Sequence, residues 1–231
     1  IMIWADNGYG KMVSRRQGNH NPRVPALPTE GDQGRHGTYY HVSFYDLQAA
    51  NHITMLPNSM EFVEEELNDA MMHGITDLWV INASNIKPHV YPLSFIANLW
   101  KRNALSAVEH RKKYVREYYG SDCSENQLIF MEECISRYPE AMLPFGDRED
   151  EHAGEQFCNY AVRDFIHGWM KDGALEPVEE LFWCTREDAF YKQVSWFEKR
   201  CSQTYDKIEE LCHKCAAVKE SELWKDSILL Q

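Results

Sequence analysis

The sequence predicts a mixed fold, with an α/β part first and an all-α part after it. Three short apolar runs typical of strands occupy residues 1–5, 38–44 and 77–82. From about residue 104 onward, apolar residues instead recur with the spacing of amphipathic helices. We therefore expect two domains, residues 1–103 and residues 104–231, in a chain whose length of 231 residues fits one or two.

Each strand is predicted from its composition. Residues 1–5 form an apolar run that the turn residues Asp6, Asn7 and Gly8 end. The second run is rich in aromatic and β-branched residues, and the third is continuous and apolar, as in parallel sheets. Between them lies a helix that Asn58 or Ser59 can cap and Gly74 can end. Strand, helix and strand make a βα unit, so we expect three parallel strands in sequence order.

The second half is predicted to be an antiparallel bundle of helices. Turn and proline residues separate them, and one of the expected breaks falls at Pro139. The expected helices cover residues 105–119, 125–137, 150–171, 187–216 and 219–230.

Composition excludes several classes of protein. Thirty-six acidic against 24 basic residues give a formal charge of −12, which argues against binding nucleic acid through general electrostatics. No apolar run is long enough for a membrane helix, so we expect a soluble protein. Seven irregularly spaced cysteines favour reduced thiols and a cytoplasmic location, although the location is not determined. Cys212 and Cys215 form a single CxxC pair inside a helical stretch, so we expect no metal site.

Polar residues at the strand ends are the candidate site. Asp6 follows the first strand, His41 lies in the second and Asn82 ends the third. In parallel α/β folds the carboxyl ends of the strands carry the site. Asp6 is a candidate general base or sugar-hydroxyl acceptor, or else a turn residue. His41 is a catalytic candidate or a hydrogen-bonded core residue.

Two further groups of residues suit a ligand with hydroxyls and a carboxylate. Asn82 and Lys87 flank the loop after the third strand and offer an amide and an ammonium, the alternative being loop structure. The glycine- and proline-rich segment from residue 6 to 37 is long enough to be a functional loop. It carries Arg15, Arg16 and Arg35, which could hold an anion or be solvated. Four tyrosine rings could stack on sugars or pack in the core: Tyr9, Tyr39, Tyr40 and Tyr45.

Taken together, the motifs resemble glycoside hydrolase family 115, the xylan α-glucuronidases. They are residues 4–10 (WADNGYG), 37–43 (GTYYHVS), 78–82 (LWVIN), 86–88 (IKP) and 91–93 (YPL), in that order. The resemblance covers about residues 1–100 well and the helical half more loosely. It implies a (β/α)8 barrel followed by a helical domain, of which this chain holds the C-terminal part of the barrel.

The resemblance also implies an activity. Family members remove glucuronic acid, or its 4-O-methyl form, from xylan side chains by inverting hydrolysis, which uses an acid and a base. It gives Asp6 and His41 as catalytic and Asn82 as a substrate contact, with the loop arginines beside the uronate. We add Asn7, Tyr9, Tyr40 and Lys87 as substrate-binding residues. No cofactor is implied, the expected partner is an acidic carbohydrate, and a homodimer is left open.

The sequence departs from the family pattern in ways that keep two alternatives open. Asn7 and Gly8 stand where the family usually has an Asp and an Asn, and the usual Val-Gly-Asp is here residues 83–85 (ASN). The family's strand with its likely catalytic glutamate would precede residue 1, so we expect a fragment that is inactive alone. One alternative is a non-catalytic relative that binds acidic carbohydrate or acts as a scaffold; another is an unrelated α/β enzyme.

Overall fold

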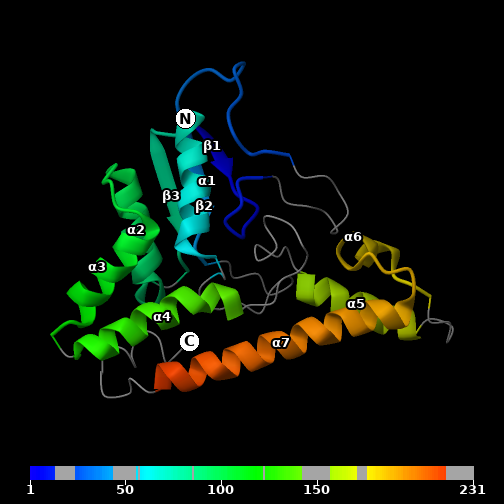
Figure 1. Ribbon diagram of the computed structural model, residues 1–231. Helices are drawn as coiled ribbons and strands as arrows, with labels where there is room; N and C mark the ends of the chain where they lie inside the picture. The colour runs from blue at the N-terminus through cyan, green and yellow to red at the C-terminus, as the bar shows by residue number, and fades with distance from the viewer. Residues whose placement is uncertain are drawn as a thin grey trace.

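A computed structural model gives the arrangement of the chain (Figure 1). It describes residues 1–13, 24–43, 56, 58–84, 86–121, 123–141, 157–170 and 176–216. The elements are β1 (Met2–Ala5), β2 (His36–His41), α1 (Met60–Met72), β3 (Leu78–Asn82), the short 3-10 helix η1 (Lys87–His89), α2 (Val90–Trp100), α3 (Ala107–Tyr119), α4 (Glu125–Ala141), α5 (Phe157–Met170), a second 3-10 helix η2 (Glu179–Leu181), α6 (Phe182–Thr185) and α7 (Phe190–Ala216).

The three strands form a parallel sheet in the order β1-β2-β3, which confirms the predicted strands and their order. Met2 of β1 lies opposite His36, and Gly37 of β2 lies opposite Leu78. Because both pairings are parallel, the carboxyl ends of the three strands meet at one edge of the sheet.

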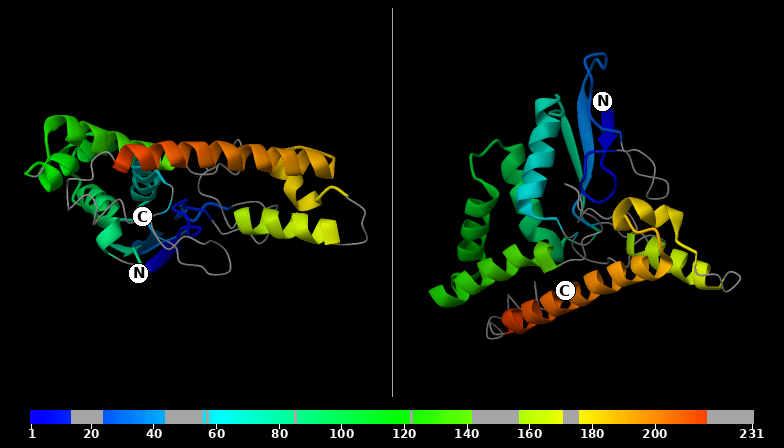
Figure 2. Two further views of the ribbon diagram at one scale, coloured as in Figure 1. Left: turned by 90° about the horizontal axis from the view of Figure 1, so that it is seen from below. Right: turned by 45° about the vertical axis from the view of Figure 1, so that its right-hand side comes forward.

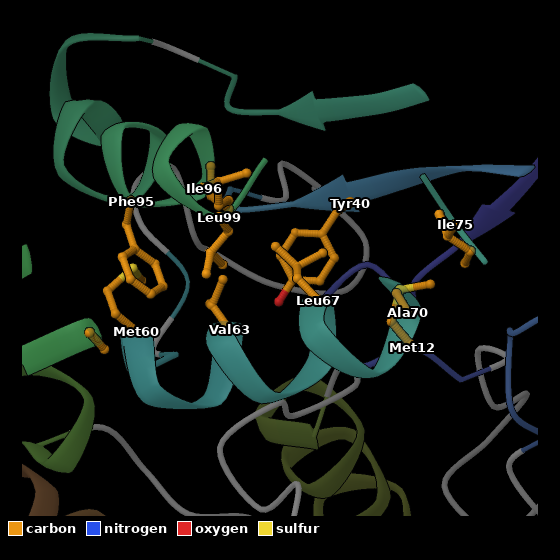
Figure 3. Close-up of a cluster of buried hydrophobic side chains, with 12 residues drawn as sticks. Met12, Tyr40, Met60, Val63, Leu67, Ala70, Ile75, Phe95, Ile96 and Leu99 are labelled. Atoms are coloured by element: carbon orange, nitrogen blue, oxygen red, sulfur yellow. The ribbon is translucent and has the colours of Figure 1, made fainter. Parts of the chain in front are cut away.

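Helix α1 covers one face of this sheet and closes the main core. Its N-terminus is capped by the Ser59 hydroxyl, which accepts a hydrogen bond from the Phe62 N–H at 3.1 Å. Gly74 follows its C-terminus with a φ of +87°, a conformation that glycine adopts without strain. Figure 3 shows the Tyr40 ring pointing from β2 towards α1, beside Leu67. Both side chains are fully buried, so this face of the sheet is packed rather than open to ligands.

Two helical features differ from the prediction. Helix α2 was not predicted, because residues 90–100 are so apolar that no polar face marks a helical period. Its buried side includes Phe95 and Leu99, which pack against α1. The expected break at Pro139 is wrong, since α4 continues to Ala141 with the proline inside it. A proline so near the end removes one backbone hydrogen bond from the last turn only.

Helix α3 contacts both halves of the molecule. It begins with a capping box, in which Ser106 and Glu109 bond each other's backbone N–H groups. Near its start the buried His110 accepts a 3.1 Å hydrogen bond from the Asn98 amide at Nδ1 and lies 2.9 Å from the Ser94 hydroxyl at Nε2. Its later residues join a second core with α4 and α7.

The long helix α7 lies alongside α4 (Figure 2). Ion pairs join them, including Lys214 Nζ to Glu133 Oε1 at 2.7 Å and Arg137 Nη1 to Glu210 Oε1 at 2.9 Å. The other end of α7 packs against α5 through Phe165 and its neighbours. The helix expected at 219–230 lies outside the described residues. Within the ranges given above, no helix combines the length and apolar character that crossing a membrane requires.

Candidate functional site

The loop that follows β1 wraps around the carboxylate of Asp6. Asp6 Oδ1 accepts a hydrogen bond from the Gly8 N–H at 3.0 Å, and Oδ2 accepts from the Gly10 N–H at 2.8 Å. Both glycines have positive φ, +88° and +85°, which turns their N–H groups towards the carboxylate. A side chain at Gly10 would also collide with the Asn58 amide. The Asp6-Asn7-Gly8 turn predicted from sequence is therefore built around Asp6.

His41, at the end of β2, pairs with the same carboxylate. Its Nδ1 lies 2.5 Å from Asp6 Oδ1, and its backbone N–H donates to Asp6 Oδ2 at 3.1 Å. The side chains of His41 and Asp6 are 7% and 0% exposed. A carboxylate only accepts hydrogen bonds, so this contact assigns the proton of the neutral imidazole to Nδ1 and the lone pair to Nε2.

The polar side chains extend from β2 to the end of β3. The Tyr39 ring meets the His41 ring edge-on, with centroids 4.7 Å apart. The Asn82 amide donates to the Tyr39 hydroxyl at 2.8 Å, and its Oδ1 accepts from the Ser84 N–H at 3.2 Å. Asp6, His41 and Asn82, predicted separately from three strand ends, therefore lie in one connected group.

Helix α1 anchors the loop from its other side. The Glu66 carboxylate accepts from Lys11 Nζ at 2.6 Å and from the Met12 N–H at 2.7 Å. The Asn58 amide donates to the Tyr9 carbonyl at 2.6 Å. Neither contact is predictable from the sequence, because both join segments about 50 positions apart in the chain.

The remaining predicted residues are placed as follows. Asn7 is buried, and its Oδ1 accepts from the Tyr9 and Lys11 N–H groups at 2.9 and 3.2 Å. The rings of Tyr9 and Tyr40 are buried in the core, so neither offers a face to a sugar in this arrangement. Lys87 is exposed at the start of η1. Arg15 and Arg16 lie outside the described residues.

Tyr39 and Tyr40 show why alternation along a strand matters. Successive side chains of a strand point to opposite faces. Tyr39 therefore shares a face with His41, whereas Tyr40 points to the α1 side, where burial raises the pKa of its hydroxyl with a further contribution from the Asp6 and Glu66 charges. The period of two in the sequence selects Tyr39, which was considered as a sugar-stacking ring but not chosen as a substrate-binding residue.

A metal centre finds no support in the part of the chain that the structure describes. There, no three His, Cys, Asp or Glu side chains come together as ligands for an ion. The donors that do converge are a carboxylate with its lone pairs engaged, an imidazole and an amide. This set suits proton transfer and hydrogen bonding to a polar ligand.

Proteins with a parallel α/β sheet place their active or binding site at the carboxyl edge of that sheet. The interacting polar side chains at this edge assign the chain to that class. The chain belongs to glycosyl hydrolase family 115, whose family model matches residues 1–142. The resemblance seen in the sequence motifs is thereby confirmed.

One similar solved structure is a family GH115 4-O-methyl-α-glucuronidase with specificity for decorated arabinogalactans. It is 16% identical to this chain, with a TM-score of 0.48, and the match covers 98% of this chain and 32% of that one. The chain therefore spans about a third of the length of that structure. A comparison with curated proteins finds no match.

Proposed function

We propose that the protein carrying this chain is a glycoside hydrolase that removes glucuronic acid, or its 4-O-methyl form, from xylan side chains with inversion. The observation that carries the proposal is the Asp6–His41 pair at the carboxyl ends of β1 and β2, in a chain of family 115. We also propose that the three strands belong to a (β/α)8 barrel and that the helices after residue 103 form a separate domain. The parallel order β1-β2-β3, with α1 crossing between β2 and β3, is the repeating unit of such a barrel.

His41 is proposed as the group that transfers a proton and Asp6 as the residue that positions it. A carboxylate has about four lone-pair sites, and Asp6 fills them with the N–H groups of Gly8, Gly10 and His41 and with His41 Nδ1. The Asp6 side chain is also fully buried. We therefore propose that the Asp6 carboxylate orients the imidazole and does not itself contact the sugar or a water. Inversion also needs a second acidic or basic group, with room for a water between the two.

The polar residues beside His41 suit the hydroxyl groups of a sugar. The Tyr39 hydroxyl and the Asn82 amide already bond each other, and both can donate and accept hydrogen bonds. A uronic acid adds a carboxylate, for which Lys87 is the exposed cation nearest in sequence to Asn82. Arg15 and Arg16 remain predicted partners of the same carboxylate.

The test is release of uronic acid from glucuronoxylan by the protein that carries this chain, compared with its His41→Gln variant. General acid–base catalysis by one side chain contributes about 10²–10⁴-fold, so the variant is expected to lose about that factor. Asp188→Asn, a change at a side chain that is 84% exposed, is the control and should keep full activity. Absence of release by the folded wild-type protein, or full activity of His41→Gln, would refute the proposal.

A second function has one specific observation in its favour. Because the Asp6 carboxylate is buried and its hydrogen bonds are made within the chain, the site can be a rigid binding edge without catalysis. This reading is the non-catalytic relative that binds acidic carbohydrate. Calorimetry with a glucuronic-acid-bearing xylo-oligosaccharide separates the two functions, since binding without any released uronic acid supports the second and excludes the first.

A further inference from the structure

Two buried cysteines meet where α4 and α7 lie side by side (Figure 2). Cys134 on α4 is 2% exposed and Cys215 on α7 is 7% exposed. Their side chains belong to the same buried cluster, the second hydrophobic core, which also holds Leu128 and Met131. Neither sulfur is in a disulfide bond in this structure. A cross-link between them would join α4 to α7 at a point where the two helices already pack against each other.

The register of the two helices is fixed at this point. The residues directly before the cysteines, Glu133 and Lys214, form an ion pair with 2.7 Å between Oε1 and Nζ. One turn away, Arg137 Nη1 bonds Glu210 Oε1 at 2.9 Å. Both pairs join α4 to α7, so the two helices lie side by side at the level of the cysteines.

The two thiols differ in their tendency to ionise. A hydrogen bond from the Cys215 thiol lowers the pKa of Cys134. Burial and the Glu133 charge oppose this effect, and the charges of Lys214 and Arg137 add to it. The same hydrogen bond raises the pKa of Cys215, and burial adds to the effect. Cys134 is therefore the better nucleophile of the two, because the thiolate is the reactive form.

Cys212 lies on α7 with Cys215 and could compete with Cys134 for a disulfide bond to it. It is exposed and lies three residues before Cys215. Side chains three apart on a helix have their Cβ atoms about 5–6 Å apart. A disulfide bond needs about 3.5–4.5 Å, so an intact α7 disfavours a bond between Cys212 and Cys215.

We propose that Cys134 and Cys215 are a reversible disulfide-forming site whose co-reactant is hydrogen peroxide, an oxidant small enough to reach nearly buried thiols. The Cys134 thiolate attacks one peroxide oxygen, the O–O bond breaks, and the departing hydroxide takes a proton to become water. Cys134 is now a sulfenic acid. The Cys215 sulfur attacks the Cys134 sulfur, the S–O bond breaks, and the leaving oxygen departs as a second water with the Cys215 proton. Two thiols are oxidised and one peroxide is reduced to two waters.

The bond joins two parts of the chain that are far apart in sequence. Cys134 lies within the family-matched residues 1–142, and Cys215 lies in the last helix described, beyond that match. Cross-linking residues so distant restricts the unfolded chain strongly. The oxidised protein is therefore expected to unfold at a higher temperature than the reduced one.

The experiment oxidises the full folded chain with hydrogen peroxide, blocks remaining thiols in denaturant, and maps the peptides without reductant. The expected product is a Cys134 peptide linked to a Cys215 peptide, lighter by two hydrogen atoms and released by dithiothreitol. Cys212→Ser, a change at an exposed thiol of the same helix, should give the same product. Cys134→Ser should abolish it, with circular dichroism to check that the variant is folded.

Three outcomes would overturn the proposal. One is that Cys134 and Cys215 are both recovered as blocked thiols while Cys212 is oxidised. Another is that the linked peptide is no more abundant than other cysteine pairs, or than after oxidation in denaturant. The third is that oxidation raises the unfolding temperature of Cys134→Ser by as much as that of the wild type.

Discussion

Replacing Asp6 by asparagine keeps the shape of the side chain and turns one of its two oxygens into a hydrogen-bond donor. If the amide nitrogen takes the place of Oδ2, it faces the N–H groups of Gly10 and His41, which both need an acceptor. If it takes the place of Oδ1, it faces the Gly8 N–H and His41 Nδ1. The second arrangement costs less, because the imidazole can change tautomer and accept from the amide. One backbone donor, that of Gly8, is then left without a partner.

A buried donor without an acceptor costs about 1–3 kcal/mol, so Asp6→Asn is expected to lower the free energy of unfolding by about that amount. The same change moves the His41 proton from Nδ1 to Nε2, which removes the lone pair that a base needs. The uronic acid release proposed above should therefore fall by about 10²–10⁴-fold, as in His41→Gln.

The assay is urea unfolding, monitored by tryptophan fluorescence. Nitrogen NMR of the His41 ring assigns its tautomer. Asp188→Asn is the matched control, because its side chain is 84% exposed and surface pairs contribute about 0–1 kcal/mol. An Asp6→Asn variant that unfolds at the wild-type urea concentration, with Nδ1 still protonated, would refute the reasoning. It would show that the loop does not depend on the carboxylate.

Three further outcomes are expected. Glu66→Gln should lower the free energy of unfolding by about 1–3 kcal/mol in urea titrations, because it breaks the partly buried pair with Lys11; an unchanged midpoint would contradict the anchoring role. Ser106→Ala should cost about 1 kcal/mol in the same assay through loss of the helix cap, and Ser106→Thr should recover most of it. Burial lowers the pKa of His110 from 6.5, so the unfolded chain binds more protons and stability should fall as the pH drops below about 6.5. Unfolding free energies at several pH values should show a shallower slope in His110→Gln, and an equal slope would argue against the buried neutral ring.

The elements were predictable where the sequence carries a clear period. The strands and α1 follow from apolar runs, a serine cap and a terminal glycine, and each is found within a few residues of its expected bounds. The edge of the sheet that gathers Asp6, His41 and Asn82 follows from the parallel order alone. Helix α2 was missed because nearly all of its residues are apolar, which leaves no polar face to reveal the period.

The contact between Asp6 and His41 could not be predicted from the sequence of either strand alone. Asp6 reaches His41 because the chain turns through Gly8 and Gly10 in left-handed conformations, and sequence marks a turn there without giving its path. The choice between Tyr39 and Tyr40, in contrast, could be made from the sequence. It follows from strand alternation once the face of His41 is known, so the information was present in the sequence.

Helix α1 links the packing of the core to the chemistry of the site. Its buried face, which includes Leu67, covers the sheet. Glu66, the residue directly before Leu67, binds the loop that wraps around Asp6. The two neighbours leave the helix in different directions, so one element fixes both the sheet and the loop. A shift of α1 along the sheet would move the Glu66 carboxylate away from the Met12 N–H and loosen the loop around Asp6. Substitutions in this core are therefore expected to lower activity by disturbing the Asp6–His41 contact before they unfold the protein.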